Sequence, residues 1–344
     1  MTSPNRDLDI IVVGAGLVGA VIASELASRG LKVAVVDSLE VASGATRRAF
    51  GLATPDLSPA HFAQTARGVG LVVQLAQQLG LTPRLMSVLH AASTPHGADA
   101  LRRLAELHAG GPIQLSWETD LALPFAGAGE GLLVHNSAFI DPAILTVRLL
   151  QQPGIVVRPH FEILSLDSQG GEVVAMTSDN TVRAAAAVLA ANAYTGLLSP
   201  YLADSARIVR GVVWRSRPKS RAEVSMPVWI DRGELIVGQT ADLRMVVAAW
   251  DWRGERGAEC PGRIHAYLEK NRPDLLNETE TWSTTQTTVT PDGAPLVGAL
   301  STGRLSDARV VYALGAGPYG LAWAPIIAEQ AAALVTHAGA SSSS

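Results

Sequence analysis

The stretch that decides the fold is DIIVVGAGLVGAVIASELASRGLKVAVVD, residues 9–37. It opens with an apolar run of strand character and passes through a glycine-rich turn at 14–19. Apolar residues at helical spacing follow, and a second apolar strand ends on the carboxylate of Asp37. Strand, glycine turn, helix and strand in this order predict a βαβ unit of the kind that binds a dinucleotide.

Each glycine of the turn has a physical task. Gly14 permits the tight turn out of the strand, Gly16 removes a side chain where the backbone approaches a pyrophosphate, and Gly19 lets helix and strand pack closely. The helix N-terminus then directs free N–H groups at the phosphates. Asp37 lies where a carboxylate accepts hydrogen bonds from ribose hydroxyls, and because it disfavours a 2′-phosphate, NADP is not expected.

Composition narrows the functional class. The 344 residues carry a formal net charge of -4 and a pI near 6.1, which gives no basic field for nucleic acid. No apolar run is long enough to span a bilayer, residues 1–7 contain no apolar signal region, and the single cysteine, Cys260, excludes an intrachain disulfide. We therefore expect a cytoplasmic protein with no transmembrane segment and no nucleic-acid partner. No spacing typical of a metal site occurs, so no metal is expected.

The rest of the chain predicts further elements and a second glycine junction. Residues 59–79 have the spacing of an amphipathic helix, and Asp141-Pro142 supplies the N-cap and first residue of another. A last strand at 309–314 meets a glycine turn at 315–320 and a terminal helix at 323–337. We interpret this junction as a second helix N-terminus that stabilises charge on another part of a cofactor, with a plain loop and helix cap as the alternative.

Four patches, in similar order and spacing along nearly the whole chain, resemble one family. The first is the nucleotide motif extended by residues 43–51, and the second is AANAY at 190–194. The third is TPDGAPLVG at 290–298, and the fourth is the glycine turn at 315–321. On these residues the chain is similar to the D-amino-acid oxidase (DAO) superfamily of FAD-dependent amine oxidoreductases. Glycine oxidase, sarcosine oxidase, D-amino-acid dehydrogenases and γ-glutamylputrescine oxidase belong to it.

The resemblance implies a mixed α/β (α+β) fold with interleaved domains. A Rossmann-like FAD-binding domain of the glutathione-reductase type is expected from residues 1–83, 141–205 and 285–340. A mixed-sheet substrate domain is expected from residues 84–140 and 206–284. The tail, 341–344, is expected to be disordered.

The resemblance also implies FAD as the cofactor. The nucleotide turn matches the ADP-pyrophosphate site, and residues 44–47 match a loop that runs under the pyrophosphate towards the ribityl chain. Phe161 or Glu162 matches a strand whose backbone meets the adenine. Backbone N–H groups of the last turn would stabilise negative charge on the reduced flavin. The implied cofactor contacts are Gly14, Ala15, Gly16, Leu17, Val18, Gly19, Asp37, Ser38, Ser43, Gly44, Ala45, Thr46, Arg47, Arg48, Phe161, Glu162, Ala191, Asn192, Gly315, Gly317, Pro318, Tyr319, Gly320 and Leu321.

Departures from the family pattern concern the FAD linkage and the substrate. Some relatives attach FAD through a histidine where this chain has Arg48, and others use a late cysteine, whereas Cys260 lies well before the matching region. We therefore expect non-covalent FAD. Relatives that act on simple amino acids place an arginine just before TPDG, where this chain has Gln286-Thr287. A bidentate guanidinium is the natural receptor for a carboxylate, so a simple amino-acid substrate is in doubt. The histidine of the family's final turn is Tyr319 here.

The implied reaction is oxidation of a C–N bond in an amine or amino acid. Hydride passes to flavin N5 and leaves an imine that water hydrolyses. The family typically needs no obligatory acid or base for this step, so the protein orients the substrate and stabilises the reduced ring. The candidate catalytic residues are Arg48, Tyr319, Gln286 and Trp214.

Further substrate contacts are suggested by the middle of the chain. Trp214, Trp250 and Trp252 are interpreted as an aromatic wall for an amine, with ordinary core packing as the alternative. Arg210 or Arg253 is a candidate to replace the missing clamp, with surface ion pairing as the alternative.

Three other functions stay open at this point. They are an FAD monooxygenase, a partner-dependent or non-catalytic FAD subunit of a heteromeric dehydrogenase, and a plain NAD(P) dehydrogenase. Substrate identity and oligomeric state are open as well. The electron acceptor is oxygen or another compound, since the sequence places none of Lys32, Lys219 and Lys270 beside a flavin.

Overall fold

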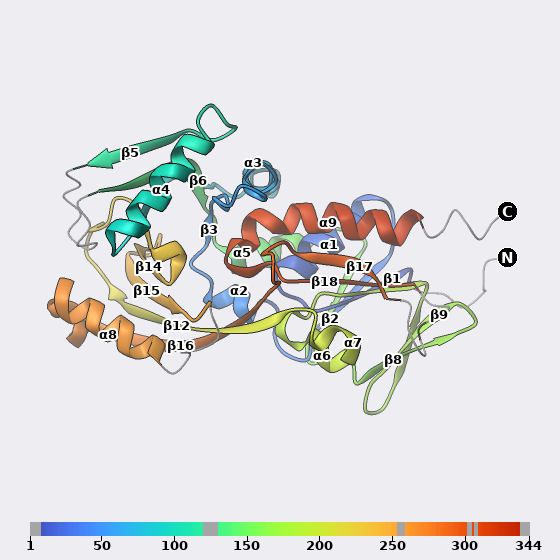
Figure 1. The fold of residues 1–344 in the computed structure, drawn as a ribbon. Coiled ribbons are helices and arrows are strands. Elements are labelled where there is room, and N and C mark those ends of the chain that lie inside the picture. Colours follow the sequence, from blue (N-terminus) through green and yellow to red (C-terminus); the bar gives the residue numbers. More distant parts are fainter. Residues whose placement is uncertain (1–7, 120–129, 253–258, 301–304, 306–308, 338–344) are drawn as a thin grey trace.

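The structure, a computed structural model, describes residues 8–119, 130–252, 259–300, 305 and 309–337. Helices and strands form sheets of both parallel and antiparallel character, so the predicted mixed α/β class is confirmed (Figure 1). The expectations for the start of the chain, for the tail at 341–344 and for Arg253 lie outside the described residues.

A six-stranded sheet contains the predicted βαβ unit. Its strands are β1 (Ile10–Val13), β2 (Val33–Val36), β7 (Ile155–Arg158), β11 (Ala186–Leu189), β17 (Leu296–Leu300) and β18 (Arg309–Leu314). Their order is β17-β18-β11-β1-β2-β7, and all neighbours are parallel except β17 and β18. Strands β1, β2 and β11 are buried along their whole length, as a parallel sheet covered on both faces requires.

Helices share one apolar core with this sheet. They are α1 (Leu17–Ser28), α3 (Phe62–Gln78), α5 (Pro142–Leu150) and α9 (Gly320–His337). Asp141 Oδ1 accepts the N–H groups of Ala143 and Ile144 at 2.9 and 3.0 Å, which confirms the predicted cap of α5. The backbones of α3 and α9 touch, because a Cβ on Gly68 would lie 1.8 Å from the carbonyl oxygen of Ala322.

The opposite face of the six-stranded sheet packs against smaller elements. These are a meander of β8 (Ser165–Gln169), β9 (Glu172–Met176) and β10 (Thr181–Ala184), and the short helices α6 (Thr195–Leu198) and α7 (Pro200–Ala203). Ile11 and Val13 of β1 share a core with Leu166 and Val173 of the meander and Leu202 of α7. Alternate residues of β1 therefore serve two cores.

A nine-stranded sheet builds the other part of the molecule. It consists of β3 (Leu52–Ala53), β4 (Arg84–Ala91), β5 (Leu115–Thr119), β6 (Glu130–Phe139), β12 (Arg207–Pro218), β13 (Val228–Ile230), β14 (Leu235–Gln239), β15 (Arg244–Trp250) and β16 (Thr279–Val289). The path is β16-β12-β15-β14-β13-β4-β6-β3, with β5 paired to β6. Figure 1 shows β12 and β16 running side by side towards the six-stranded sheet.

The two faces of this sheet have different partners. One face packs on α8 (Cys260–Asn271) through residues that include Val212 and Trp214. The other face carries Val213 and Trp229 and meets Phe50 and Tyr319, which come from segments next to the six-stranded sheet. We call this second side the inward face.

The sheets depart from the predicted domain segments in two places. Strand β3 falls within the expected segment 1–83 of the FAD-binding domain, yet it pairs with β6 of the nine-stranded sheet. Strand β16 of the same sheet crosses the expected boundary between residues 284 and 285. The domain division otherwise stays a prediction. Within the described ranges, no helix combines the length and apolar character needed to cross a membrane, and no three His, Cys, Asp or Glu side chains are grouped to hold a metal.

Candidate active site

The turn between β1 and α1 has the geometry that pyrophosphate binding needs. Gly14 has φ +113°, and a Cβ there would lie 2.5 Å from the carbonyl oxygen of Ala190. A Cβ on Gly19 would lie 2.0 Å from the carbonyl oxygen of Gly14, so helix and strand are in contact at this point. A Cβ on Gly16 would meet the Thr46 hydroxyl at 3.2 Å. The backbone at Gly16 is thus open at the start of α1, which fits a phosphate of FAD.

The loop that follows β2 is fastened to this turn. Leu17 donates its N–H to Thr46 Oγ1 at 3.0 Å, and Thr46 lies in the short helix α2 (Ala45–Arg48). Arg48 donates from Nη1 to the carbonyl oxygens of Ser43 and Gly44, the latter at 2.9 Å. The guanidinium of Arg48 therefore braces the loop that was predicted to run under the pyrophosphate.

The carboxylate of Asp37 is held at the end of β2 by two backbone groups. Its Oδ2 accepts the N–H of Ala15 at 2.8 Å, and its Oδ1 accepts the N–H of Leu39 at 2.9 Å. Phe161 donates its N–H to the Asp37 carbonyl oxygen at 2.7 Å, and Glu162 beside it is exposed. Residues predicted for the adenosine side are therefore brought together. Each carboxylate oxygen keeps a lone pair for a ribose hydroxyl.

Asn192 connects the end of β11 to β16. It has φ 52°, and its Oδ1 accepts both the N–H and the hydroxyl of Thr288, each at 3.0 Å. Its Nδ2 donates to the carbonyl oxygen of Gln286 at 3.2 Å. The Thr288 hydroxyl also accepts the N–H of Gly315 at 2.9 Å. One amide side chain thus fixes β16 and the start of the last glycine turn relative to β11.

The last glycine turn contacts the inward face of the nine-stranded sheet. Gly315 and Gly317 have φ +83° and +55°, which allow the chain to reverse before α9. The ring of Tyr319 lies 5.2 Å from the ring of Trp229, and Trp229 lies 5.6 Å from His90, centroid to centroid. Trp229 and His90 are paired across β13 and β4. The turn implied for the flavin is therefore in direct contact with the inward face of the nine-stranded sheet, which we call the substrate sheet because the substrate domain was expected there.

Burial controls the chemistry of this aromatic cluster. His90 is 3% exposed, and burial lowers its pKa to about 4, so the ring is neutral at physiological pH. Burial also raises the pKa of the Tyr319 hydroxyl well above its ordinary value. His90 Nε2 and Trp229 Nε1 are buried without a hydrogen-bond partner in the described structure. The hydroxyl of Tyr319 is therefore neutral at physiological pH.

The remaining predicted cofactor contacts lie in the same segments. Ser38 follows β2 and Arg47 lies in α2, and both are exposed. The others lie at the start of α1, in α2, just after β11, in the turn before α9 and at the start of α9: Val18, Ala45, Ala191, Pro318, Gly320 and Leu321.

Two of the four residues predicted to be catalytic, Trp214 and Gln286, do not lie on the inward face. Trp214 is fully buried on the α8 side of β12, and its Nε1 donates to Thr279 Oγ1 at 2.9 Å, so it packs the core behind the sheet. Gln286 is exposed and pairs with the exposed Arg210 across β16 and β12. Thr287, next in the strand, is 7% exposed. Successive side chains of a strand point to opposite faces of the sheet, so Gln286 and Thr287 lie on opposite faces. Arg210, which pairs with Gln286, lies on the same face as Gln286.

The other two tryptophans lie at one end of the sheet. Trp250 covers Gly211, where a Cβ would lie 2.5 Å from the indole, and it packs with the residues of the inward face. Trp252 stacks on Trp250 with ring centroids 4.8 Å apart. Trp250 is thus the tryptophan of the predicted wall that lies with Tyr319 on the inward face.

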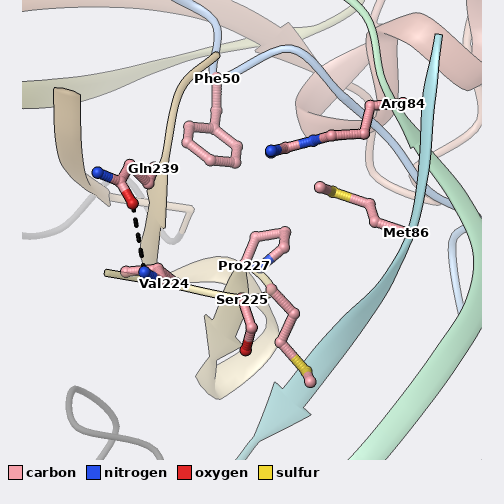
Figure 2. Close-up of a pocket in the computed structure, with 8 residues that line it drawn as sticks. Phe50, Arg84, Met86, Val224, Ser225, Pro227 and Gln239 are labelled. Carbon is pink, nitrogen blue, oxygen red and sulfur yellow. Dashed lines mark hydrogen bonds between the residues drawn. The ribbon is translucent and has the colours of Figure 1, made fainter. Parts of the chain in front are cut away.

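A side-chain cluster that the sequence does not reveal lies beside Phe50. The space between its members has no room for a water molecule, and Figure 2 shows the Phe50 ring, the Arg84 guanidinium and the Met86 thioether directed towards one another. Arg84 and Met86 come from β4, and Pro227 precedes β13. The alternation of Arg84, Met86, Val88 and His90 along β4 is the signal that would have indicated a common face.

Comparisons with known proteins agree with this arrangement. A tRNA 5-methylaminomethyl-2-thiouridine biosynthesis bifunctional protein MnmC from Ectopseudomonas mendocina (strain ymp) is 28% identical over 322 residues, which is 86% of this chain and 48% of that protein. Glycine oxidase from Bacillus licheniformis is 27% identical over 209 residues, 55% of each. The chain thus spans about half the length of the curated relatives it matches.

Solved structures share the fold. Glycine oxidase from Geobacillus kaustophilus has a TM-score of 0.78 at 21% identity, and the match covers 97% of this chain and 95% of that one. L-proline dehydrogenase from P. horikoshii has a TM-score of 0.81 at 19% identity, with 97% and 94% covered. A family model described as DAO, FAD dependent oxidoreductase, matches residues 9–334. Because that match takes in nearly every described element, the chain belongs to the DAO family of FAD-dependent oxidoreductases.

Proposed function

We propose that this enzyme oxidises a C–N bond of a small amine or amino acid and releases an imine that water hydrolyses. The observation that carries the proposal is the contact between Tyr319 and Trp229, 5.2 Å apart, which joins the last glycine turn to the inward face of the substrate sheet. A substrate between these elements would lie against the flavin. FAD, when bound, supplies the hydride acceptor.

The chain's own residues bind the cofactor, orient the substrate and stabilise charge on the reduced ring. The pyrophosphate binds at the open backbone of Gly16 and the start of α1. The carboxylate of Asp37 accepts hydrogen bonds from the ribose hydroxyls. Backbone N–H groups after Gly315 stabilise negative charge that develops on the reduced ring. Tyr319 and Trp229 form an apolar wall that excludes water from the reacting carbon.

We further propose that FAD is held without a covalent bond. Arg48, where some relatives have the attaching histidine, is occupied with the carbonyl oxygens of Ser43 and Gly44. A guanidinium does not form such a linkage. Acid precipitation of the purified protein should therefore release all flavin into the supernatant, and flavin retained in the pellet would contradict the proposal.

A small molecule is favoured as the substrate over a modified nucleotide in RNA. The name of the MnmC relatives concerns tRNA modification, but this chain covers 48% of the first of them. Its formal net charge of -4 supplies no basic field for a polynucleotide. A soluble protein in the cytoplasm, with oxygen or another acceptor reoxidising the flavin, completes the proposal.

The decisive experiment is anaerobic reduction of the FAD-loaded protein by a panel of amines and amino acids. We expect loss of flavin absorbance near its visible maximum with at least one amine, and formation of the matching carbonyl compound after hydrolysis. Gly16→Val should remove FAD, because its side chain would enter the pyrophosphate position, whereas Gly70→Ala is the matched control, since a Cβ at Gly70 meets nothing within 4 Å. A yellow protein that no member of the panel reduces would refute the proposed reaction.

A further inference from the structure

A buried histidine lies where α3 meets α9 and the turn at 290–294. His61 immediately precedes α3 and is 7% exposed. Its ring lies 5.6 Å from the ring of Trp323, near the start of α9, centroid to centroid. A Cβ on Gly293 would lie 3.4 Å from His61 Cε1, so the turn at 290–294 covers the same imidazole. The proposed reaction does not use this titratable ring.

The imidazole of His61 is paired with the carboxylate of Asp56. Asp56 Oδ2 lies 3.2 Å from His61 Nδ1, and the two side chains are 16% and 8% exposed. The Ser58 hydroxyl lies 3.0 Å from the same nitrogen, so the hydrogen bonds of the ring within the described chain all go to Nδ1. Because a carboxylate only accepts, we assign the proton of the neutral ring to Nδ1. Nε2 is then the basic nitrogen.

Thr65 fixes Asp56 and His61 relative to each other. Its hydroxyl accepts the N–H of Asp56 at 2.9 Å and donates to the carbonyl oxygen of His61 at 2.8 Å. Asp56 Oδ1 also accepts the N–H of Ser58 at 2.9 Å. Thr65 is fully buried. Carboxylate and imidazole are therefore held in place by the chain itself, and we call them the buried pair.

The charges of the buried pair act on both neighbouring turns. Burial raises the pKa of Tyr319 in the last glycine turn, and the charge of Asp56 raises it further. Hydrogen bonds within the turn at 290–294 lower the pKa of Asp292, and the charge of His61 lowers it further. Asp292, Tyr319 and, beyond Tyr319, Arg232 are the ionisable groups that face the pair from other elements of the described chain. A charge on the pair therefore reaches the turn implied for the flavin.

We propose that the buried pair of Asp56 and His61 binds a proton when FAD in this enzyme is reduced. Reduction by a hydride adds one negative charge at the flavin site. His61 Nε2 then takes a proton from solvent, and Asp56 stabilises the imidazolium through Nδ1–H. The added positive charge balances the added negative charge. Because the pair is buried, this attraction is screened less than one between surface charges.

His61 is thus a positioning residue for charge rather than a group that touches the substrate. The inference requires bound FAD and does not depend on which amine is oxidised. A purely structural role would need the ring volume and the Nδ1–H donor of His61, but not its titration. The number of protons bound on reduction separates the two roles.

The test is the midpoint potential of FAD in the loaded protein, measured against pH with dithionite and reference dyes. The slope gives the number of protons bound per two electrons. For the parent we expect a pH interval with two protons, and one proton above it. His61→Asn keeps an N–H donor for Asp56 and cannot titrate, so its slope should correspond to one proton in that interval. Asp56→Asn should move the interval to lower pH by about one unit or more, because the imidazolium loses its carboxylate.

His160→Asn is the matched control. His160 forms an exposed pair with Glu40, with Nε2 2.7 Å from Oε1, and its φ of 55° suits asparagine. Its potential should have the slope of the parent at every pH. The absorption spectrum of the reduced flavin, recorded in the same titration, distinguishes protonation of the ring from protonation of the protein.

Three results would overturn the assignment. The first is a parent slope of one proton from about pH 5 to about pH 9. The second is a two-proton interval that persists unchanged in His61→Asn, since the flavin or another residue would then bind the second proton. The third is an interval at the parent's pH in Asp56→Asn, and this variant decides the matter if His61→Asn does not retain FAD. The electrons come from dithionite, so failure of every amine in the panel would refute the proposed reaction and leave this result standing.

Discussion

The hydroxyl of Thr288 donates to Asn192 Oδ1 at 3.0 Å and at the same time accepts the N–H of Gly315 at 2.9 Å. Thr288 is 3% exposed, so this chain of hydrogen bonds is shielded from water. It joins the ends of three strands at the place where the substrate sheet meets the last glycine turn. The position of that turn thus depends on a side chain outside it.

The first prediction concerns this connection. Thr288→Val should lower the free energy of unfolding by about 1–3 kcal/mol, because the Gly315 N–H and Asn192 Oδ1 lose a buried partner. Thr288→Ser keeps the hydroxyl and should stay close to the parent. Urea unfolding with and without added FAD measures both variants. Equal stability of the valine and serine variants would show that the hydroxyl makes no net contribution.

The second prediction concerns Asp37. Asp37→Ala should weaken FAD retention by about 1.5–3 kcal/mol, the range of a hydrogen bond to a charged group. The structure adds a second cause, because the same carboxylate holds the N–H of Ala15 in the nucleotide turn. Asp37→Asn keeps an oxygen acceptor and should lose less. Equilibrium dialysis measures the affinity, and unchanged retention in Asp37→Ala would refute the ribose assignment.

The third prediction concerns the missing family arginine. Glycine and D-alanine should reduce the flavin poorly in the parent, since a compact carboxylate placed away from a cation is desolvated without compensation. Thr287→Arg should raise the rate with these two compounds, because Thr287 is 7% exposed and adjoins Asn192 at the end of the substrate sheet. Thr287→Gln controls for side-chain size. Fast anaerobic bleaching of the parent by micromolar glycine would refute this view.

The fourth prediction is a pH dependence of stability. His90 has a native pKa of about 4 against an ordinary value of 6.5. Between these values the unfolded chain binds a proton that the native protein does not, so the free energy of unfolding falls as the pH falls through this window. About 3 kcal/mol of the free energy of unfolding is lost once the pH has fallen below the native pKa of His90. Above the ordinary pKa of histidine, none of this free energy is lost.

His90→Phe tests this contribution, since it removes the titrating group and keeps an aromatic ring beside Trp229. In urea unfolding at several pH values, the free energy of unfolding should decrease less with falling pH for His90→Phe than for the parent. His96→Phe, at an exposed position in α4 (Pro95–Leu107), is the control and should follow the parent. Parallel curves for parent and His90→Phe would rule out the buried neutral imidazole as the cause.

The parts of the fold that depend on neighbouring residues were predictable from sequence. The glycine turn at 14–19, the Asp141 cap and the last strand–turn–helix junction each reflect geometry within one short segment. The substrate sheet is different, because which face a residue occupies depends on strands far away in the chain. Trp214 is a large aromatic residue in the expected region, but its register with β15 and β16 turns it towards α8.

The cluster of Phe50, Arg84 and Met86 was missed for a related reason. In the sequence Arg84 is a charged residue before an apolar strand, a pattern typical of a solvent-exposed strand end, and its side chain is exposed in the structure. Its relation to Phe50 arises because β4 lies in the nine-stranded sheet while Phe50 follows α2. No local pattern connects these two segments, and only the assembled fold brings them together.

The contact between Gly68 of α3 and the Ala322 carbonyl oxygen of α9 has a consequence for the electron chemistry. Ala322 is two residues into the helix whose first turn is implied for the flavin, and even a methyl group at position 68 would force that helix to shift. The N–H groups facing the flavin would then change their distance from the ring. We therefore expect Gly68→Ala to displace the reduction potential of bound FAD, although residue 68 lies outside the segments predicted to contact the cofactor.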